Sequence, residues 1–269
     1  MKKYTPLLVL GLLLLRIPIL NGVEFLWGPI SDWVVLLFEV IWYLLLAFMI
    51  WIEKDSLACF NIDKLSLVIF LLFGTIFRTS ILQEKLMCFE GLPFWIIGIS
   101  LAITLWRSHV KFPAMKIGNY WQIFEGVFVG VALSVTLTLP WLLWNNRDPA
   151  PAEAWKNVSI SILILGAIHQ LAHAAIFEEP MFRGFLWGYL RKVNWKEKWI
   201  LLFQASLFWI AHINYLDRPY SFWIAVPVSG IVLGFLVWRS RSLVSAMFAH
   251  AIVNSMSYVM LDLLFHFLR

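Results

Sequence analysis

The sequence predicts an all-α fold, a polytopic bundle of eight or nine membrane-spanning helices. Of its 269 residues, 61% are hydrophobic and only 14% are charged, whereas soluble domains contain roughly 45–50% apolar and about 25% charged residues. A chain of this size cannot bury that excess of apolar side chains in a water-soluble fold. The composition therefore excludes a soluble enzyme, a disordered chain and a nucleic-acid-binding protein coated with basic residues.

Nine apolar stretches approach the length of about 20 helical residues that crosses roughly 30 Å of hydrocarbon. In chain order they are residues 5–21, 33–52, 65–82, 92–106, 121–144, 158–190, 199–213, 222–238 and 243–267. Arg16 lies inside the first stretch and the fourth is short, so eight spans remain the alternative. Lysines precede the first stretch, but no small-residue cleavage site follows it, which favours a spanning helix over a signal peptide.

The basic stretch Arg107–Lys116 divides the chain into residues 1–116, whose role the sequence leaves unassigned, and a chemically richer part, residues 117–269. With a cytoplasmic N-terminus and nine alternating helices, 13 of the 21 Lys and Arg residues fall inside and 6 outside. The positive-inside rule favours this orientation. Many of the 16 tryptophans lie near predicted helix ends, as an interfacial belt requires. Cys59 and Cys88 fit no metal-ligand spacing.

Ionisable and amide side chains interrupt the apolar stretches of the second part. A charge at mid-bilayer costs about 2.5–3.5 kcal/mol even on the insertion scale, so such residues face the bundle interior and indicate a functional site by default. They are His169, His173, Glu178, Glu179, Arg183, His212, His250 and Asn254. In the first part Glu39 and Arg16 stand out, as structural partners or as snorkelling side chains.

Two adjacent glutamates precede a proline in the sixth stretch. Glu179 and Arg183 are four residues apart, so on a helix they can form an ion pair. Glu178 projects about 100° away from Glu179, and we expect it to be the carboxylate that acts as a general base. Pro180 is expected to kink the helix or to mark its first turn. An ion pair that only locks the bundle is the alternative.

Histidines lie in two later stretches. His250 and Asn254 share one helix face, where imidazole and carboxamide donors could hold an oxyanion. Counting about 1.5 Å per residue from the helix ends, Glu178, His212 and His250 all reach the middle third of the membrane. Gly230 and Gly234 suit close helix packing.

A metal site at His169 and His173 is the weaker reading. The two histidines share a helix face, as metal ligands often do, but His173 lies about 140° around an unkinked helix from Glu178. The three side chains would therefore not converge, so we do not expect a metal at these histidines.

Three motifs on successive apolar stretches together resemble the CPBP family, the CAAX proteases and bacteriocin-processing proteins also known as Abi. They are Glu178-Glu179…Arg183, Phe208…His212 and His250…Asn254, and the run from Gly230 toward His250 is also similar. The resemblance covers about residues 120–268. It implies a glutamic intramembrane endopeptidase, located in a prokaryotic plasma membrane, that needs no metal or organic cofactor.

The resemblance also implies roles for the motif residues. Glu178, assisted by His212, would activate a water, His250 and Asn254 would stabilise the oxyanion, and Glu179 with Arg183 would hold the geometry. Family substrates include prenylated C-terminal motifs, leader peptides and C-terminal anchoring tags, so the expected partners are membrane lipid and a membrane-embedded or lipid-associated peptide.

Three other interpretations remain open at this point. The first is a non-catalytic scaffold or immunity protein of the same family. The second is a metal-dependent membrane hydrolase or redox enzyme that uses the histidines. The third is a transporter with a proton relay, which the lack of a second matching half disfavours.

Overall fold

A computed structural model describes residues 4–15, 19, 32–75, 91–110, 118–144 and 160–267, and every regular element among them is helical. This agrees with the predicted all-α class. The elements before residue 145 are α1 (Thr5–Leu14), α3 (Asp32–Ile52), the 3-10 turn η1 (Leu57–Phe60), α4 (Lys64–Thr75), α5 (Leu92–Arg107) and α6 (Gly118–Trp144). The later ones are α7 (Ile160–Gln170), η3 (Leu171–Ala175), α8 (Ile176–Glu179), η4 (Pro180–Leu186), α9 (Trp187–Lys192), α10 (Glu197–Ile210), η5 (Ile213–Tyr215), η6 (Ser221–Ala225), α11 (Val226–Ser240) and α12 (Val244–Phe267).

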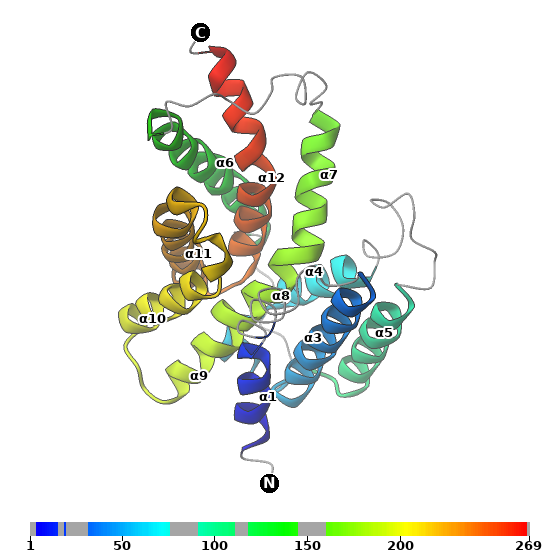
Figure 1. Ribbon diagram of the computed structural model, residues 1–269. Helices are drawn as coiled ribbons and strands as arrows, with labels where there is room; N and C mark the ends of the chain where they lie inside the picture. Colours follow the sequence, from blue (N-terminus) through cyan, green and yellow to red (C-terminus); the bar gives the residue numbers. More distant parts are fainter. Residues whose placement is uncertain are drawn as a thin grey trace.

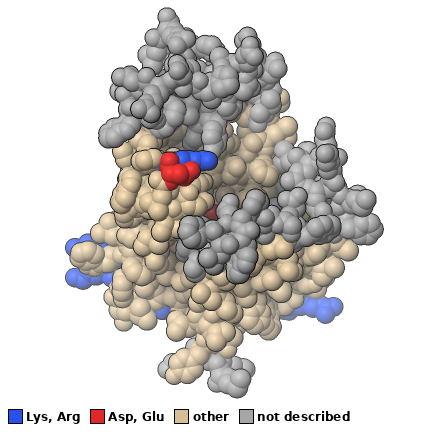
Figure 2. Space-filling model, viewed as in Figure 1, with Lys and Arg blue, Asp and Glu red and all other residues tan. Residues whose placement is uncertain are grey.

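The surface and the helices are those of an integral membrane protein. Three of the described helical segments are long and apolar enough to cross a bilayer, namely Val34–Ile52, Tyr120–Thr138 and Ser221–Ser240. Shorter apolar helices accompany them, and large side chains such as Trp106 (78%) and Phe128 (74%) are exposed. Charged side chains are sparse on the visible face, where Lys and Arg gather mainly at the lower flanks (Figure 2).

Each of the nine predicted stretches contains a helix, but several ends differ from the prediction. The predicted stretches 5–21 and 65–82 run into residues outside the described ranges, and Arg16 and Cys88 lie there too. The predicted stretch 199–213 is too long, because α10 ends at Ile210 and His212 lies in the turn that follows. The polar residues Asn214 and Asp217 and then Pro219 favour that turn.

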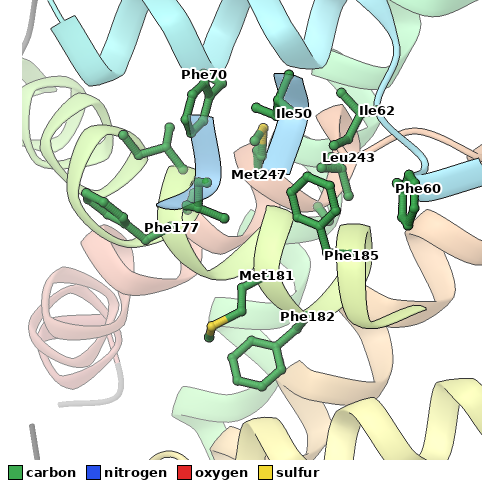
Figure 3. Packing of buried hydrophobic residues seen from close by; sticks show 14 of the residues in the cluster. Ile50, Phe60, Ile62, Phe70, Phe177, Met181, Phe182, Phe185, Leu243 and Met247 are labelled. Carbon is green, nitrogen blue, oxygen red and sulfur yellow. The ribbon is translucent and has the colours of Figure 1, made fainter. Parts of the chain in front are cut away.

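The helices form one packed body, in which α6, α7 and α12 extend to one end while α3, α4 and α5 lie together on one side (Figure 1). A single hydrophobic cluster runs from Val9 in α1 through α3, α4 and α5 to Ala251 in α12. Figure 3 shows Phe60 and Ile62 of the first part beside Phe185 and Leu243 of the second. The residues before and after the basic stretch at 107–116 therefore share one core.

A long helix with two π-helical segments carries the two adjacent glutamates. Its parts follow one another without a break from α7 to α9, and the π-helical segments η3 and η4 flank the four residues of α8. Pro180, which has no backbone N–H to donate, is the first residue of η4. Short π-helical segments within α-helices occur frequently at functional sites.

The predicted close packing at Gly230 and Gly234 is confirmed between α10 and α11. A Cβ at Gly230 would lie 3.3 Å from the Phe208 ring and 3.4 Å from the carbonyl oxygen of Ala205. A Cβ at Gly234 would overlap the Gln204 amide. The two glycines therefore allow α11 to approach α10 closely.

Ion pairs tie several helix ends together where α9 ends and α10 begins. Glu53 accepts hydrogen bonds from Tyr189 and Lys192, while Glu197 pairs with Arg191 and Arg241 at 2.8 Å each. Partial burial alone would raise the pKa of Glu197. The hydrogen bonds from Arg191, Arg241 and Trp187 outweigh that effect and lower its pKa to about 2.

Gly188 is expected to be intolerant of a side chain. A Cβ there would overlap the Phe60 ring and lie 2.9 Å from the carbonyl oxygen of Cys59. Because overpacking costs typically about 1–3 kcal/mol, Gly188→Ala should lower the thermal unfolding midpoint of the purified protein. Gly11→Ala in α1 is the control, since no atom lies within 4 Å of the added methyl group. Equal midpoints for the two variants would contradict this packing.

Candidate active site

The two glutamates of α8 face different surroundings. Glu179 is fully buried and binds Arg183, with 3.1 Å between Oε1 and Nη1. The predicted ion pair between these residues is therefore present. Arg183 is also fully buried, its guanidinium lies 4.2 Å from the centre of the Phe208 ring, and Nη2 donates to the carbonyl oxygen of Gly230 at 3.4 Å.

His250 of α12 lies between both glutamates. Its Nδ1 is 2.7 Å from Oε1 of Glu179, and its Nε2 is 3.9 Å from Oε2 of Glu178. Since Arg183 donates to the same Oε1 atom, this one oxygen of Glu179 accepts hydrogen bonds from both the imidazole and the guanidinium. This arrangement fixes the orientation of the His250 ring and directs Nε2 toward Glu178.

His212 reaches the same region from the turn after α10. Its Nδ1 is 2.8 Å from the carbonyl oxygen of Phe208, and a carbonyl can only accept, so Nδ1 carries the proton. In the neutral ring Nε2 is then an acceptor. The His212 ring packs against the Phe208 ring with 4.6 Å between the ring centres, and the His250 ring packs against the same Phe208 ring at 5.9 Å. The structure thus brings His250 to Glu178 and places His212 against the Phe208 ring that His250 also contacts, although His212 lies beyond its helix.

Asn254 lies one turn after His250 on α12, as predicted, and its amide has a partner that the sequence did not suggest. Nδ2 of Asn254 donates to Oε1 of Gln170 at 3.1 Å. Gln170 is the last residue of α7, immediately before the first π-helical segment. A carboxamide carries two N–H donors, and Gln170 uses one of them.

Gln204 is a second buried amide that supports the site. Its Nε2 donates to the carbonyl oxygen of Gly230 at 3.1 Å, which is the same oxygen that Arg183 contacts. The glycine carbonyl therefore connects α10, α11 and the helix of the two glutamates. A buried Gln on an otherwise apolar helix was the only signal in the sequence that could have identified it.

His173 and Glu39 form a separate pair, which explains the carboxylate in α3. Nε2 of His173 is 3.1 Å from Oε1 of Glu39, and the rings of His169 and His173 are 5.5 Å apart. Glu39 is therefore a structural partner of the later helix. Within the part of the chain that the structure describes, no three His, Cys, Asp or Glu side chains are grouped as metal ligands would be.

The chemistry that these groups can perform is acid–base chemistry on a water and a carbonyl. Glu178 lies near the imidazole of His250, which a second carboxylate holds, and His212 presents an acceptor beside the same Phe208 ring that His250 contacts. Donors on His250 and Asn254 lie one helical turn apart. This set can take a proton from a water and stabilise a negative oxygen.

Comparison with known protein families gives a match over the segment that contains the site. Residues 160–256 match the family described as type II CAAX prenyl endopeptidase Rce1-like. All seven residues of the three sequence motifs lie inside this segment, so the match confirms the resemblance drawn from them. No curated protein and no solved structure matches the chain.

Proposed function

We propose that this membrane protein, whose residues 160–256 are similar to type II CAAX prenyl endopeptidases, is an intramembrane endopeptidase. It hydrolyses a peptide bond of a membrane-embedded or lipid-associated protein. The observation that carries the proposal is the position of His250, between the ion-paired Glu179 and the neighbouring Glu178. A bundle-locking ion pair alone would not require a second carboxylate or an oriented imidazole.

In the proposed reaction Glu178 accepts a proton from a water, and the resulting hydroxide attacks the scissile carbonyl carbon. His212 assists, because its Nε2 is an acceptor when Nδ1 donates to the Phe208 carbonyl. The carbonyl oxygen becomes an oxyanion. When the tetrahedral intermediate collapses, the C–N bond breaks and the proton held by Glu178 passes to the departing amine.

His250 and Asn254 are the proposed oxyanion donors. In the proposed intermediate the His250 ring carries a hydrogen on each nitrogen, so that Nδ1–H donates to Glu179 and Nε2–H donates to the oxyanion, while Asn254 offers the second hydrogen of its amide. Removing one donor of such a pair costs about 10²- to 10³-fold in kcat. Glu179 and Arg183 have the supporting role of holding the His250 ring.

The remaining parts of the proposal concern cofactors and topology. The proposed reaction uses no metal, and water attacks the carbonyl directly, without an acyl-enzyme. The chain spans a prokaryotic plasma membrane eight or nine times with a cytoplasmic N-terminus. The ionic groups gathered where α9 ends and α10 begins support the cytoplasmic placement of that end.

A comparison of membrane proteomes tests the function and reveals the substrate class. Cells with the wild-type protein are compared with cells carrying Glu178→Gln at normal expression. We expect a set of proteins that retain an extra terminal segment only in the mutant, with C-terminal processing or removal of an anchoring tag as the leading form.

Glu125→Gln is the matched control for this comparison, because Glu125 is a carboxylate of α6 that pairs with Arg239 at 2.7 Å, outside the site. This variant should process the same proteins as the wild type. Identical proteomes for wild type and Glu178→Gln, with both proteins present in the membrane, would refute the protease and favour the scaffold.

A further inference from the structure

Asn61, in the part of the chain before the Rce1-like segment, contacts both helices that build the site. Its side chain is fully buried and its backbone has a left-handed φ of 57°. Nδ2 donates to the carbonyl oxygen of Arg183 at 2.8 Å. The carbonyl oxygen of Asn61 accepts a hydrogen bond from the backbone N–H of Leu243 at 3.1 Å, just before α12 begins.

The surface of the glutamate-bearing helix is shaped to receive the segment that carries Asn61. Two glycines one turn apart, Gly184 and Gly188, leave room for the backbone of η1, and a Cβ on Gly184 would lie 3.3 Å from the carbonyl oxygen of Phe60. Arg191 donates to the carbonyl oxygen of Cys59 at 2.6 Å and to Oδ1 of Asn61 at 3.3 Å. Figure 3 shows the Phe60 ring near Phe185 and Leu243.

The contacts of Asn61 lead to the proposed reacting groups by two short routes. The first route starts at the Arg183 carbonyl oxygen. The Arg183 guanidinium then lies 3.1 Å from Oε1 of Glu179, and that oxygen lies 2.7 Å from Nδ1 of His250. The second route follows α12 from Leu243 to His250, two helical turns or about 10 Å along the axis. Both routes end at His250, so Asn61 connects the Glu179–His250 pair with the start of α12.

We propose that Asn61 is a positioning residue that sets the placement of His250 relative to Glu178 and Glu179. The inference rests on the proposed protease function. It also assigns a role to the first part of the chain, because Asn61 holds the helix of the two glutamates against the start of α12; we call this set of contacts the clamp. The position requires a residue that tolerates a left-handed φ and offers both a donor and an acceptor. Asparagine meets all three conditions.

The substitution Asn61→Asp tests the hydrogen bond that the Asn61 amide donates to the Arg183 carbonyl oxygen. Aspartate also tolerates the left-handed backbone and keeps an acceptor for Arg191, but as a carboxylate it cannot donate to the Arg183 carbonyl. Asn194→Asp is the matched control, because Asn194 also has a left-handed φ, 64°, and is exposed in the turn between α9 and α10.

The test compares wild type, Asn61→Asp and Asn194→Asp in lipid vesicles, using a substrate whose cleavage is lost in Glu178→Gln. A misplacement of about 1 Å can cost about 100-fold in rate, so we expect Asn61→Asp to lower kcat about 10- to 100-fold with little change in KM. Amide hydrogen exchange should increase in residues 180–190 and 243–250 of this variant. Asn194→Asp should match wild type in both measurements.

The outcomes separate this inference from the proposed function. Wild-type kcat in Asn61→Asp, or a loss explained entirely by a smaller folded fraction, would overturn the positioning role, and so would unchanged hydrogen exchange in the two segments. If the wild type cleaves nothing while Asn61→Asp raises exchange in both segments, the clamp stands and the protease proposal fails.

Discussion

Glu178→Gln is expected to remove peptide cleavage, lowering kcat/KM by roughly 10²- to 10⁴-fold, the usual contribution of a general base. Glutamine has nearly the same size and keeps one carbonyl oxygen, but it cannot take a proton from a water. Glu178 lies 3.9 Å from Nε2 of His250 and is half-buried, so the substitution should leave the packing intact. The measurement is the rate of cleavage by purified protein in lipid vesicles, together with its helicity and thermal unfolding midpoint.

Glu125→Gln is again the control for this experiment, since it removes a charge of the same kind from α6. It should cleave at the wild-type rate. Full activity in Glu178→Gln would be incompatible with the mechanism, and Glu179 would then have to be tested as the base.

Arg183→Ala is expected to cause the largest loss of folded protein. It leaves the fully buried Glu179 without its guanidinium and removes the cation over the Phe208 ring. Breaking a buried ion pair by removing one partner costs about 3–5 kcal/mol, and the hydrogen bond from Nδ1 of His250 that Glu179 retains compensates for only part of this loss. The yield of membrane-inserted protein and its unfolding midpoint measure the effect.

Arg239→Ala removes an exposed arginine that pairs with the partly buried Glu125. Exposed pairs contribute about 0–1 kcal/mol, so this control should retain a near-normal yield. If Arg183→Ala folds normally but fails to cleave, Arg183 takes part in the reaction itself rather than in the support of Glu179.

Local sequence spacing predicted those features of the site that lie within one helix. A separation of four residues places Glu179 beside Arg183 and Asn254 one turn after His250 wherever the chain is helical. Apolar stretches of sufficient length identified the helices. These predictions depend only on the helical repeat and on the energy of burying apolar side chains, and both are local properties.

The contacts between distant segments could not be predicted in this way. Nothing in the spacing indicated that His250 would bind Glu179 by Nδ1, that Asn254 would donate to Gln170, or that Glu39 would pair with His173. Each depends on how helices rotate and pack against one another. The π-helical segments add to the difficulty, because they change the angle between the residues on either side.

The clamp at Asn61 also constrains the order in which the protein can mature. Asn61 leaves the ribosome early, whereas its partner Arg183 follows 122 residues later and Leu243 later still. Contacts between such distant residues form late, after the cost in chain entropy has been met. A nascent chain that lacks α12 has neither His250 nor the second contact of Asn61. Under the proposed mechanism, a chain gains hydrolytic activity only after most of the polypeptide has been inserted, so an incomplete chain would not cleave neighbouring membrane proteins.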